Sequence, residues 1–371
     1  MNVISEGARG DGSTNDTPAI QRASDKVRAA GGGTVVFPSG VYLLYDSVHI
    51  YPGISYVGTG ASVIRAKSNY PKDTRLFTTE SFPWIGLGDS PLLVVRGLIF
   101  DGQSSQQGAY KNYENEHAHL LYLSGSPWLP GRLRALVESS TFRNGVADGL
   151  SIAANTDVQV RNVRAENSFR GGVVVTGGYT KVDVDGLTTI GDVDRTGIDV
   201  ETDLPGYGGS LKNETVWKNL DLDADLDFGL LGGSTVYAEN ITMHSGPIFL
   251  MARDSSSIRI VNSTLAVGMA DSYLNRIVAP GSVSFENTTF VMTQQGYGDY
   301  YGIDIYWQLF PTTSQQFVSC NGCRFTTDGT VRAGVPVYGF VSRSKSGNDS
   351  LTVTNSSFTS RFTAGIRYIA G

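Results

Sequence analysis

Residues 238–265 read AENITMHSGPIFLMARDSSSIRIVNSTL, and this stretch contains the unit that is repeated along most of the chain. The order apolar, polar, Asn, polar, polar, apolar stands at both of its ends, and the apolar segment GPIFLM lies between them. Apolar spacings of three and four over about ten residues, which a helix would need, are missing. Each unit therefore predicts two short strands that are separated by turns.

The same two pieces return from residue 90 to the C-terminus, many of them 21 to 25 residues apart. One such unit cannot bury its apolar side alone, whereas coils stacked on one another can. Strands of successive coils would lie parallel and about 4.8 Å apart, joined by right-handed crossovers. We therefore predict an all-β fold, a single-stranded right-handed parallel β-helix of about ten coils over residues 46–371, with loop insertions.

Residues 1–45 follow another pattern, which predicts a cap over the open end of the coils. Asp16 is expected to be the N-cap of an α-helix, Pro18 suits its first turn, and the glycines at 31–33 end it. The apolar positions of this amphipathic helix form one stripe: Ile20, Ala23, Val27 and Ala30.

The composition narrows the class of partner. The formal net charge of −6 gives no support for nucleic-acid binding, which would need a basic face. No run of 18 apolar residues predicts membrane insertion, and the first residues lack the pattern of a signal peptide. We therefore expect a chain that is cytosolic, assembled inside a cell, or trimmed from a longer protein.

The two cysteines and the sequons have structural interpretations. Cys320 and Cys323 form a CxxC pair, for which we expect structural thiols or a local disulfide rather than a metal site. Four N-x-S/T asparagines share one place in the repeat, which favours a ladder of turn amides over glycosylation. The sequons stand at Asn213, Asn240, Asn262, Asn287, Asn348 and Asn355.

The opening segment GARGDGSTNDTPAIQRA, continued by AAGGGTVVFPSGVYLL, resembles right-handed parallel β-helix proteins of the pectate-lyase-3 type. That group includes phage tailspike depolymerases, polygalacturonase-like hydrolases and alginate epimerase modules. The resemblance implies a polysaccharide or oligosaccharide partner, a homotrimer, and a location in a virion tail or outside the cell. The chain lacks the DPHE signature of the epimerase modules and the NTD, DD, GHG and RIK series of polygalacturonases.

Asp199 and Glu201, in TGIDVET, are the first candidates for catalysis. If Ile198 and Val200 point inward, alternation places both carboxylates on the outer face of one strand, about 7 Å apart. Inverting glycosidases hold their carboxyl groups roughly 6.5–9.5 Å apart, so that a water fits between them. An ordinary solvated acidic strand is the alternative interpretation.

Neighbouring coils add polar candidates. Arg170, Arg195, Asp227 and His244 each precede a glycine-opened strand by two residues, which predicts one column of side chains beside Asp199 and Glu201. The arginines would hold substrate carboxylates or hydroxyls, and Asp227 or His244 would act as acid or base. Aromatic residues that would stack on sugar rings, or else line a trimer interface, are Tyr207, Tyr301, Tyr306 and Trp307.

Two weaker patterns remain. Alternate aspartates at residues 221–227 could bind Ca²⁺, although a turn near Ala224 is expected to divide them. His119 aligns with Asp148 one coil later, which permits a His–Asp pair. We expect no metal or other cofactor beyond this weak calcium pattern.

The residues and the resemblance together predict a polysaccharide depolymerase, a glycoside hydrolase of the phage tailspike type that acts on a bacterial surface polysaccharide. The first alternative is a polysaccharide lyase or uronate epimerase on the same fold. The second is a carbohydrate-binding structural fibre protein without catalysis.

Overall fold

The computed structural model describes residues 1–80, 86–108, 115–126, 128–191, 196–202, 212–268, 275–294, 299–305, 315–342, 350–359 and 361–368. The chain divides into two compact units, the first formed mainly by Met1–Gly197 and the second by Ile198–Thr202 with Leu211–Gly371. Each unit is a stretch of right-handed parallel β-helix built from two sheets, A and B, so the predicted fold class is confirmed.

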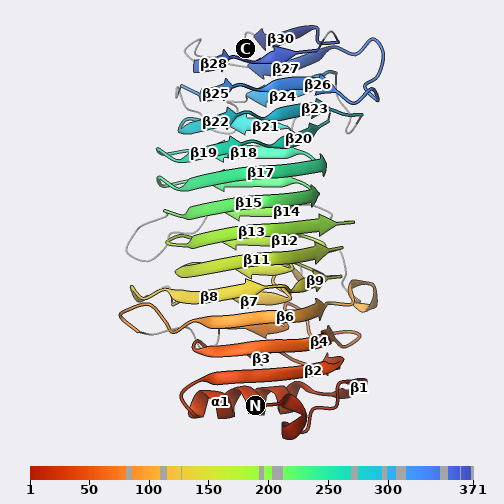
Figure 1. Ribbon diagram of the computed structural model, residues 1–371, viewed down its shortest axis with the longest axis vertical. Coiled ribbons are helices and arrows are strands. Elements are labelled where there is room, and N and C mark those ends of the chain that lie inside the picture. Colours follow the sequence, from red (N-terminus) through yellow and green to blue (C-terminus); the bar gives the residue numbers. More distant parts are fainter. Residues whose placement is uncertain are drawn as a thin grey trace. The chain divides into compact units, whose positions relative to one another are not determined.

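In the first unit, one or two strands of sheet A alternate along the chain with single strands of sheet B, and neighbouring strands pair in parallel. Figure 1 shows β2, β4, β6 and β8 one above the other. Sheet A contains β1 (Asp11–Asn15), β2 (Gly33–Leu44), β4 (Ile54–Ala66), β6 (Leu93–Asp101), β8 (Leu133–Glu138), β9 (Thr141–Arg143), β11 (Thr156–Glu166) and β13 (Lys181–Ile190). Sheet B contains β3 (Val48–His49), β5 (Phe77–Thr78), β7 (Leu121–Leu123), β10 (Leu150–Ile152) and β12 (Gly171–Thr176).

The second unit repeats this arrangement. Its sheet A contains β15 (Glu214–Asp223), β17 (Thr235–Ser245), β19 (Ser257–Val261), β20 (Thr264–Val267), β22 (Ser282–Glu286), β23 (Thr289–Met292), β25 (Phe317–Asn321), β26 (Arg324–Thr327), β28 (Ser350–Thr354) and β29 (Ser357–Phe358). Its sheet B contains β14 (Thr196–Glu201), β16 (Leu226–Leu230), β18 (Ile248–Ala252), β21 (Arg276–Val278), β24 (Tyr301–Ile305), β27 (Val337–Ser342) and β30 (Ala364–Tyr368).

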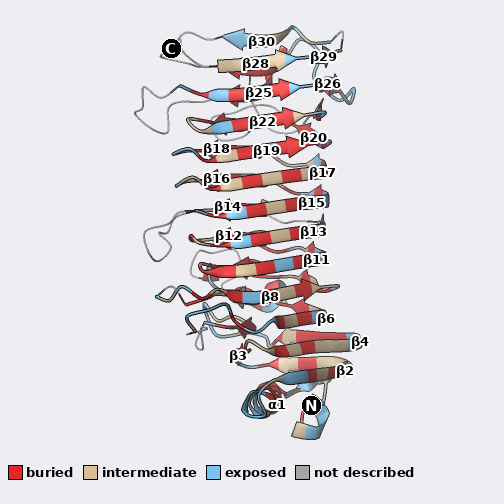
Figure 2. Cartoon of the chain, turned by 60° about the vertical axis from the view of Figure 1, so that its left-hand side comes forward, coloured by how far each residue is buried: buried red, intermediate tan, exposed pale blue. Residues whose placement is uncertain are grey.

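Side chains at equivalent positions of successive coils stack to form the core. The phenyl rings of Phe290 and Phe325 have centroids 4.9 Å apart, and those of Phe325 and Phe358 are 4.5 Å apart. Alternating burial along β15 and β17 is visible in Figure 2. The predicted inward residues of sheet B are all at most 2 % exposed: Leu150, Ile152, Val173, Val175, Ile198, Val200, Ile303 and Ile305.

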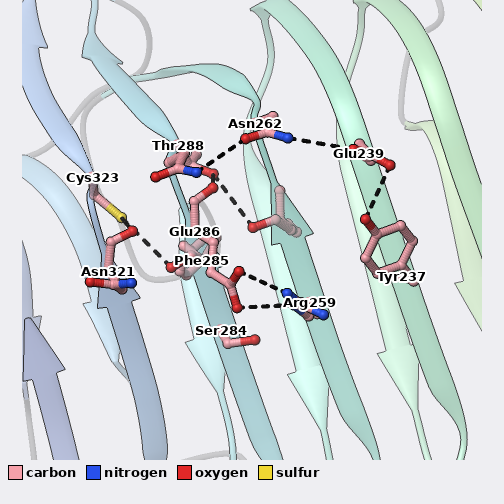
Figure 3. Close-up of polar contacts among 12 residues, drawn as sticks. Tyr237, Glu239, Arg259, Asn262, Ser284, Phe285, Glu286, Thr288, Asn321 and Cys323 are labelled. Carbon is pink, nitrogen blue, oxygen red and sulfur yellow. Dashed lines mark hydrogen bonds and ion pairs between the residues drawn. The ribbon is translucent and has the colours of Figure 1, made fainter.

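The turn asparagines combine a backbone requirement with a side-chain ladder. Asn240, Asn262 and Asn287 have φ between 48° and 56°, a left-handed conformation that asparagine tolerates better than β-branched residues. The Asn287 amide donates to Asn262 Oδ1 over 3.3 Å. The Asn262 amide in turn donates to Glu239 Oε1 over 3.4 Å (Figure 3). The shared sequon position thus has a structural role within the coils.

The cap helix α1 spans Thr17–Ala29 and buries Ile20, Ala23 and Val27. Asp16 occupies the N-cap position but makes no side-chain bond to the helix. Its carboxylate instead accepts the backbone N–H groups of Arg9 and Gly10 over 2.7 and 3.1 Å, which ties the preceding loop to the cap. No helix in the described part of the chain is long and apolar enough to cross a membrane.

Cys320 and Cys323 are joined by a disulfide, one of the two structural arrangements expected for this pair. Both residues are about 1 % exposed, so the bond lies in the interior of the coil.

Substitutions of Asn287 test whether the left-handed backbone conformation or the side-chain amide ladder contributes more to the stability of the turns. Replacing it by Val should destabilise the protein by about 1–2 kcal/mol, because a β-branched residue is strained at positive φ. Asn287→Gly keeps the conformation and loses only the exposed amide bond, so its unfolding midpoint should lie close to that of the wild type. Chemical denaturation of both variants measures this, and equal losses would assign the effect to the amide ladder instead.

Candidate functional site

The second unit brings four carboxylates together on the outer side of sheet B. Asp199 in β14 is in register with Asp227 in β16, and Glu201 is in register with Gly229. The backbone N–H of Ile198 donates to the carbonyl of Asp225 over 3.3 Å, which places Asp225 at the start of the same coil. We call Asp199, Glu201, Asp225 and Asp227 the carboxylate cluster.

Burial changes the acidity of this cluster. Desolvation raises the pKa of Asp227 to about 8, and the negative charges of Glu201 and Asp225 add to the effect. Burial also raises the pKa of Asp225 to about 7. At neutral pH the Asp227 carboxyl is therefore mostly protonated, and it can donate a proton.

Protein shields these carboxylates more than the sequence indicated. Asp199 is only 7 % exposed, and Glu201 and Asp227 are half-buried. The outward direction predicted for Asp199 and Glu201 agrees with the inward burial of Ile198 and Val200. The interpretation as a freely solvated acidic strand does not hold for Asp199, which is shielded, whereas Glu201 keeps part of its side chain accessible.

Strand geometry predicts different separations for two pairs of residues in the carboxylate cluster. Asp199 and Asp227 lie side by side on adjacent strands, about 4.8 Å apart at the backbone, whereas Glu201 is two residues further along. Retaining glycosidases hold their carboxyl groups about 5–5.5 Å apart and inverting enzymes 6.5–9.5 Å. The side-by-side pair resembles the first arrangement, and the diagonal pair of Asp227 and Glu201 resembles the second.

Of the column expected for Arg170, Arg195, Asp227 and His244, the last two residues do not share one position in the coils. Asp227 lies within its strand beside Asp199 rather than two residues before the strand. His244 lies near the end of β17 in sheet A, where its Nε2 is 2.6 Å from Asp221 Oδ1 and more than half of each side chain is exposed. Arg195 lies outside the described residues.

The first unit contains a second polar group, which includes Arg170. His119 Nδ1 is 3.0 Å from Asp148 Oδ2, so the aligned pair does meet, and these side chains are 5 % and 1 % exposed. Arg170 Nε lies 3.5 Å from the other Asp148 oxygen, and its Nη1 lies 3.7 Å from Glu116 Oε2. The His119 ring stacks on Tyr122 with centroids 5.4 Å apart.

The His119–Asp148 pair is a close, buried contact between an imidazole and a carboxylate. Asp148 contacts one ring nitrogen, Nδ1, and leaves Nε2 on the opposite side of the imidazole. Arg170 places a positive charge beside the pair, where it can attract an anionic group.

Among the expected sugar-binding aromatics, Tyr301 is corrected by the structure. It is 0 % exposed, and its hydroxyl accepts the backbone N–H of Arg332 over 3.1 Å, so it belongs to the core. Tyr207, Tyr306 and Trp307 lie outside the described residues.

The alternate aspartates are divided by the turn, as expected. Asp221 and Asp223 are exposed on β15 of sheet A, whereas Asp225 and Asp227 approach or enter β16 of sheet B. Among the residues with described positions, no group of three or more His, Cys, Asp or Glu has an arrangement that could hold a metal ion.

Sequence reasoning missed the role of Asp225, which it grouped with the calcium pattern. The sequence did contain a signal, because Asp225 stands immediately before the apolar strand LDFGL. A residue just before a strand lies close to the first outward residue of that strand, here Asp227.

Comparison with known proteins agrees with this architecture. Residues 1–97 match the family model described as rhamnogalacturonase A/epimerase, pectate lyase-like. The mannuronan C5-epimerase AlgE3 of Azotobacter vinelandii is 29 % identical over 207 residues, which cover 48 % of this chain and 11 % of that protein. The matched part of this chain spans only about a tenth of the length of this relative.

Solved structures match over the whole chain at low identity. The A-module of mannuronan C-5 epimerase AlgE6 from Azotobacter vinelandii has a TM-score of 0.64 at 15 % identity, covering 100 % of this chain and 96 % of that one. An exopolygalacturonase from Thermotoga maritima has a TM-score of 0.65 at 14 % identity, with coverages of 98 % and 92 %. The chain is therefore a right-handed parallel β-helix protein, and its first 97 residues are similar to the pectate-lyase-like family model.

Proposed function

We propose that this protein is a polysaccharide depolymerase that hydrolyses glycosidic bonds at the carboxylate cluster. The observation that carries the proposal is the position of Asp227, a carboxyl group with a raised pKa, in register with Asp199 and close to Glu201. An acid that stays protonated at neutral pH beside ionised carboxylates is the combination that glycoside hydrolysis requires.

In this mechanism Asp227 donates its proton to the glycosidic oxygen as the bond between that oxygen and the anomeric carbon breaks. Glu201 takes a proton from a water molecule, whose oxygen then bonds to the anomeric carbon. The diagonal separation of Asp227 and Glu201 leaves space for this water, which favours inversion. Asp225, together with Glu201, helps to keep the Asp227 proton in place before substrate binds.

The comparisons support a polysaccharide substrate, since the similar proteins are named as a mannuronan epimerase and an exopolygalacturonase. The finer proposal is a phage tailspike type of enzyme that acts on a bacterial surface polysaccharide. It includes a homotrimer and a location in the virion tail or outside the cell. The resemblance of the opening segment to tailspike proteins supports these features.

A second candidate function is favoured by the His119–Asp148 pair. In a polysaccharide lyase or uronate epimerase, His119 Nε2 would take the proton α to a uronate carboxylate that Arg170 attracts. A lyase would then expel the glycosidic oxygen from the β carbon and leave a carbon–carbon double bond. An epimerase would return a proton to the opposite face of the sugar.

Substitutions in the cluster test the first proposal against the second. Asp227→Asn and Glu201→Gln should each reduce turnover at least about a hundredfold, because each removes one of the two proton transfers. Asp221→Asn is the matched control, an exposed acid on the neighbouring sheet, and it should keep full activity. Turnover is measured by new reducing ends on bacterial surface polysaccharides.

Other outcomes select the alternatives. Products that absorb ultraviolet light as unsaturated uronates, with loss of activity in His119→Asn and not in Asp227→Asn, would replace hydrolysis by elimination. Retained polysaccharide binding without any turnover would identify a carbohydrate-binding fibre protein.

The pH dependence gives an independent test. Because Asp227 must be protonated to act, kcat/KM should fall as the pH rises through about 8, the raised pKa of this carboxyl. The same shift makes the folded protein bind the proton more tightly than the unfolded chain, so stability should also decrease as the pH rises from about 4 towards 8. In Asp227→Asn this component of the stability change should disappear, and an unchanged profile would contradict the assignment.

A further inference from the structure

Among the described residues of β14, β16, β18, β21 and β24, the outer face of sheet B is accessible in one small area. Asp199 is 7 % exposed, Arg276 2 %, Val278 1 % and Asp304 3 %, although all lie on these strands. Four neighbouring outward residues are instead only half-buried: Glu201, Asp227, Phe249 and Met251. The accessible area therefore consists of two acids and two apolar side chains.

The register places these side chains against one another. Phe249 in β18 is in register with Asp227, and Met251 is in register with Gly229, which in turn pairs with Glu201. Phe249 and Met251 point outward, because Ile248, Leu250 and Ala252 between them are 0 % exposed. The apolar pair thus lies one coil from the acidic pair.

Gly229 lies between the acidic and the apolar side chains, in register with Glu201 on one side and Met251 on the other. A Cβ atom added there would lie 3.4 Å from the carbonyl oxygen of Val200 and 3.5 Å from Met251 Cε. In this register no side chain separates Glu201 from Met251, because the residue between them is glycine. We call Phe249, Met251 and Gly229 the apolar shelf.

We propose that the apolar shelf binds a neutral pyranose ring of the polysaccharide, in the subsite next to the bond that is cleaved. This inference rests on the proposed function. A pyranose presents C–H groups on its faces, and these pack on an aromatic ring, as apolar surface does. A ring on Phe249 would hold its glycosidic oxygen beside Asp227, because the two residues are in register on adjacent strands.

The charges around the shelf argue for a neutral ring rather than a uronate. The titratable neighbours of the shelf on the β16 side are the acids Asp227 and Glu201, and a substrate carboxylate would be repelled by the ionised one. On the other side Arg276 is in register with Phe249, but it is 2 % exposed and its next neighbour in register is Asp304. A neutral ring avoids this repulsion.

Binding measurements on the whole chain test this inference without relying on turnover. The probes are neutral gluco-, galacto- and manno-oligosaccharides and, for comparison, oligomannuronate and oligogalacturonate, titrated by calorimetry. A neutral oligosaccharide should bind more tightly than either uronate, and Phe249→Ala should weaken its binding about tenfold. Phe249→Trp should retain binding, since it keeps an aromatic face.

Phe317→Ala is the matched control, because Phe317 is 43 % exposed on sheet A of the same unit. It should leave affinity unchanged. Tighter binding of a uronate, no binding of any neutral probe, or equal affinity of Phe249→Ala and the wild type would each overturn the inference. If turnover depends on Asp227 but Phe249→Ala binds and turns over as the wild type does, the apolar shelf is overturned and the proposed hydrolysis stands. If Phe249→Ala loses binding but neither the wild type nor any variant shows turnover, hydrolysis is overturned and the apolar shelf stands.

Discussion

The parallel backbone pairing from coil to coil is the constraint on which the rest of the structure depends. Each strand of sheet B is held in register by its neighbours, as in the pairing of Ile198 with Leu226 and of Leu226 with Ile248. A slip of one residue would exchange the inner and outer faces of a strand. The stacked core, with Phe325 between Phe290 and Phe358, prevents such a slip because it fits only one register.

The same pairing creates the chemistry of the carboxylate cluster. Stacking places Asp227 beside Asp199 and close to Glu201 at a cost in electrostatic energy, which protonation of Asp227 relieves. The shielding of the outer face strengthens this effect, since a buried carboxylate loses hydration. The next coil continues the row with Phe249, so acidic and apolar side chains become neighbours without being close in sequence.

Local patterns were sufficient to predict the strands, the inward residues and the His119–Asp148 pair. They failed for His244 because the spacing of the repeat in the sequence becomes shorter between residues 229 and 246. An alignment by glycines cannot detect where the chain passes from one sheet to the other, and His244 lies in sheet A. They failed for Tyr301 because a tyrosine can face the core if its hydroxyl finds a backbone partner, here the N–H of Arg332. Neither outcome is encoded in the spacing of apolar residues.

The sequence by itself determined the repeat, and with it the parallel β-helix, the cap helix and the outward direction of Asp199 and Glu201, because strand alternation and turn chemistry are local properties. Only the tertiary structure decided which coils are in register, how far the outer face is shielded, and therefore that Asp227 rather than His244 joins the acids of β14. The physical reason is that burial and electrostatic coupling arise between residues of different coils, about 22 to 28 positions apart in the chain.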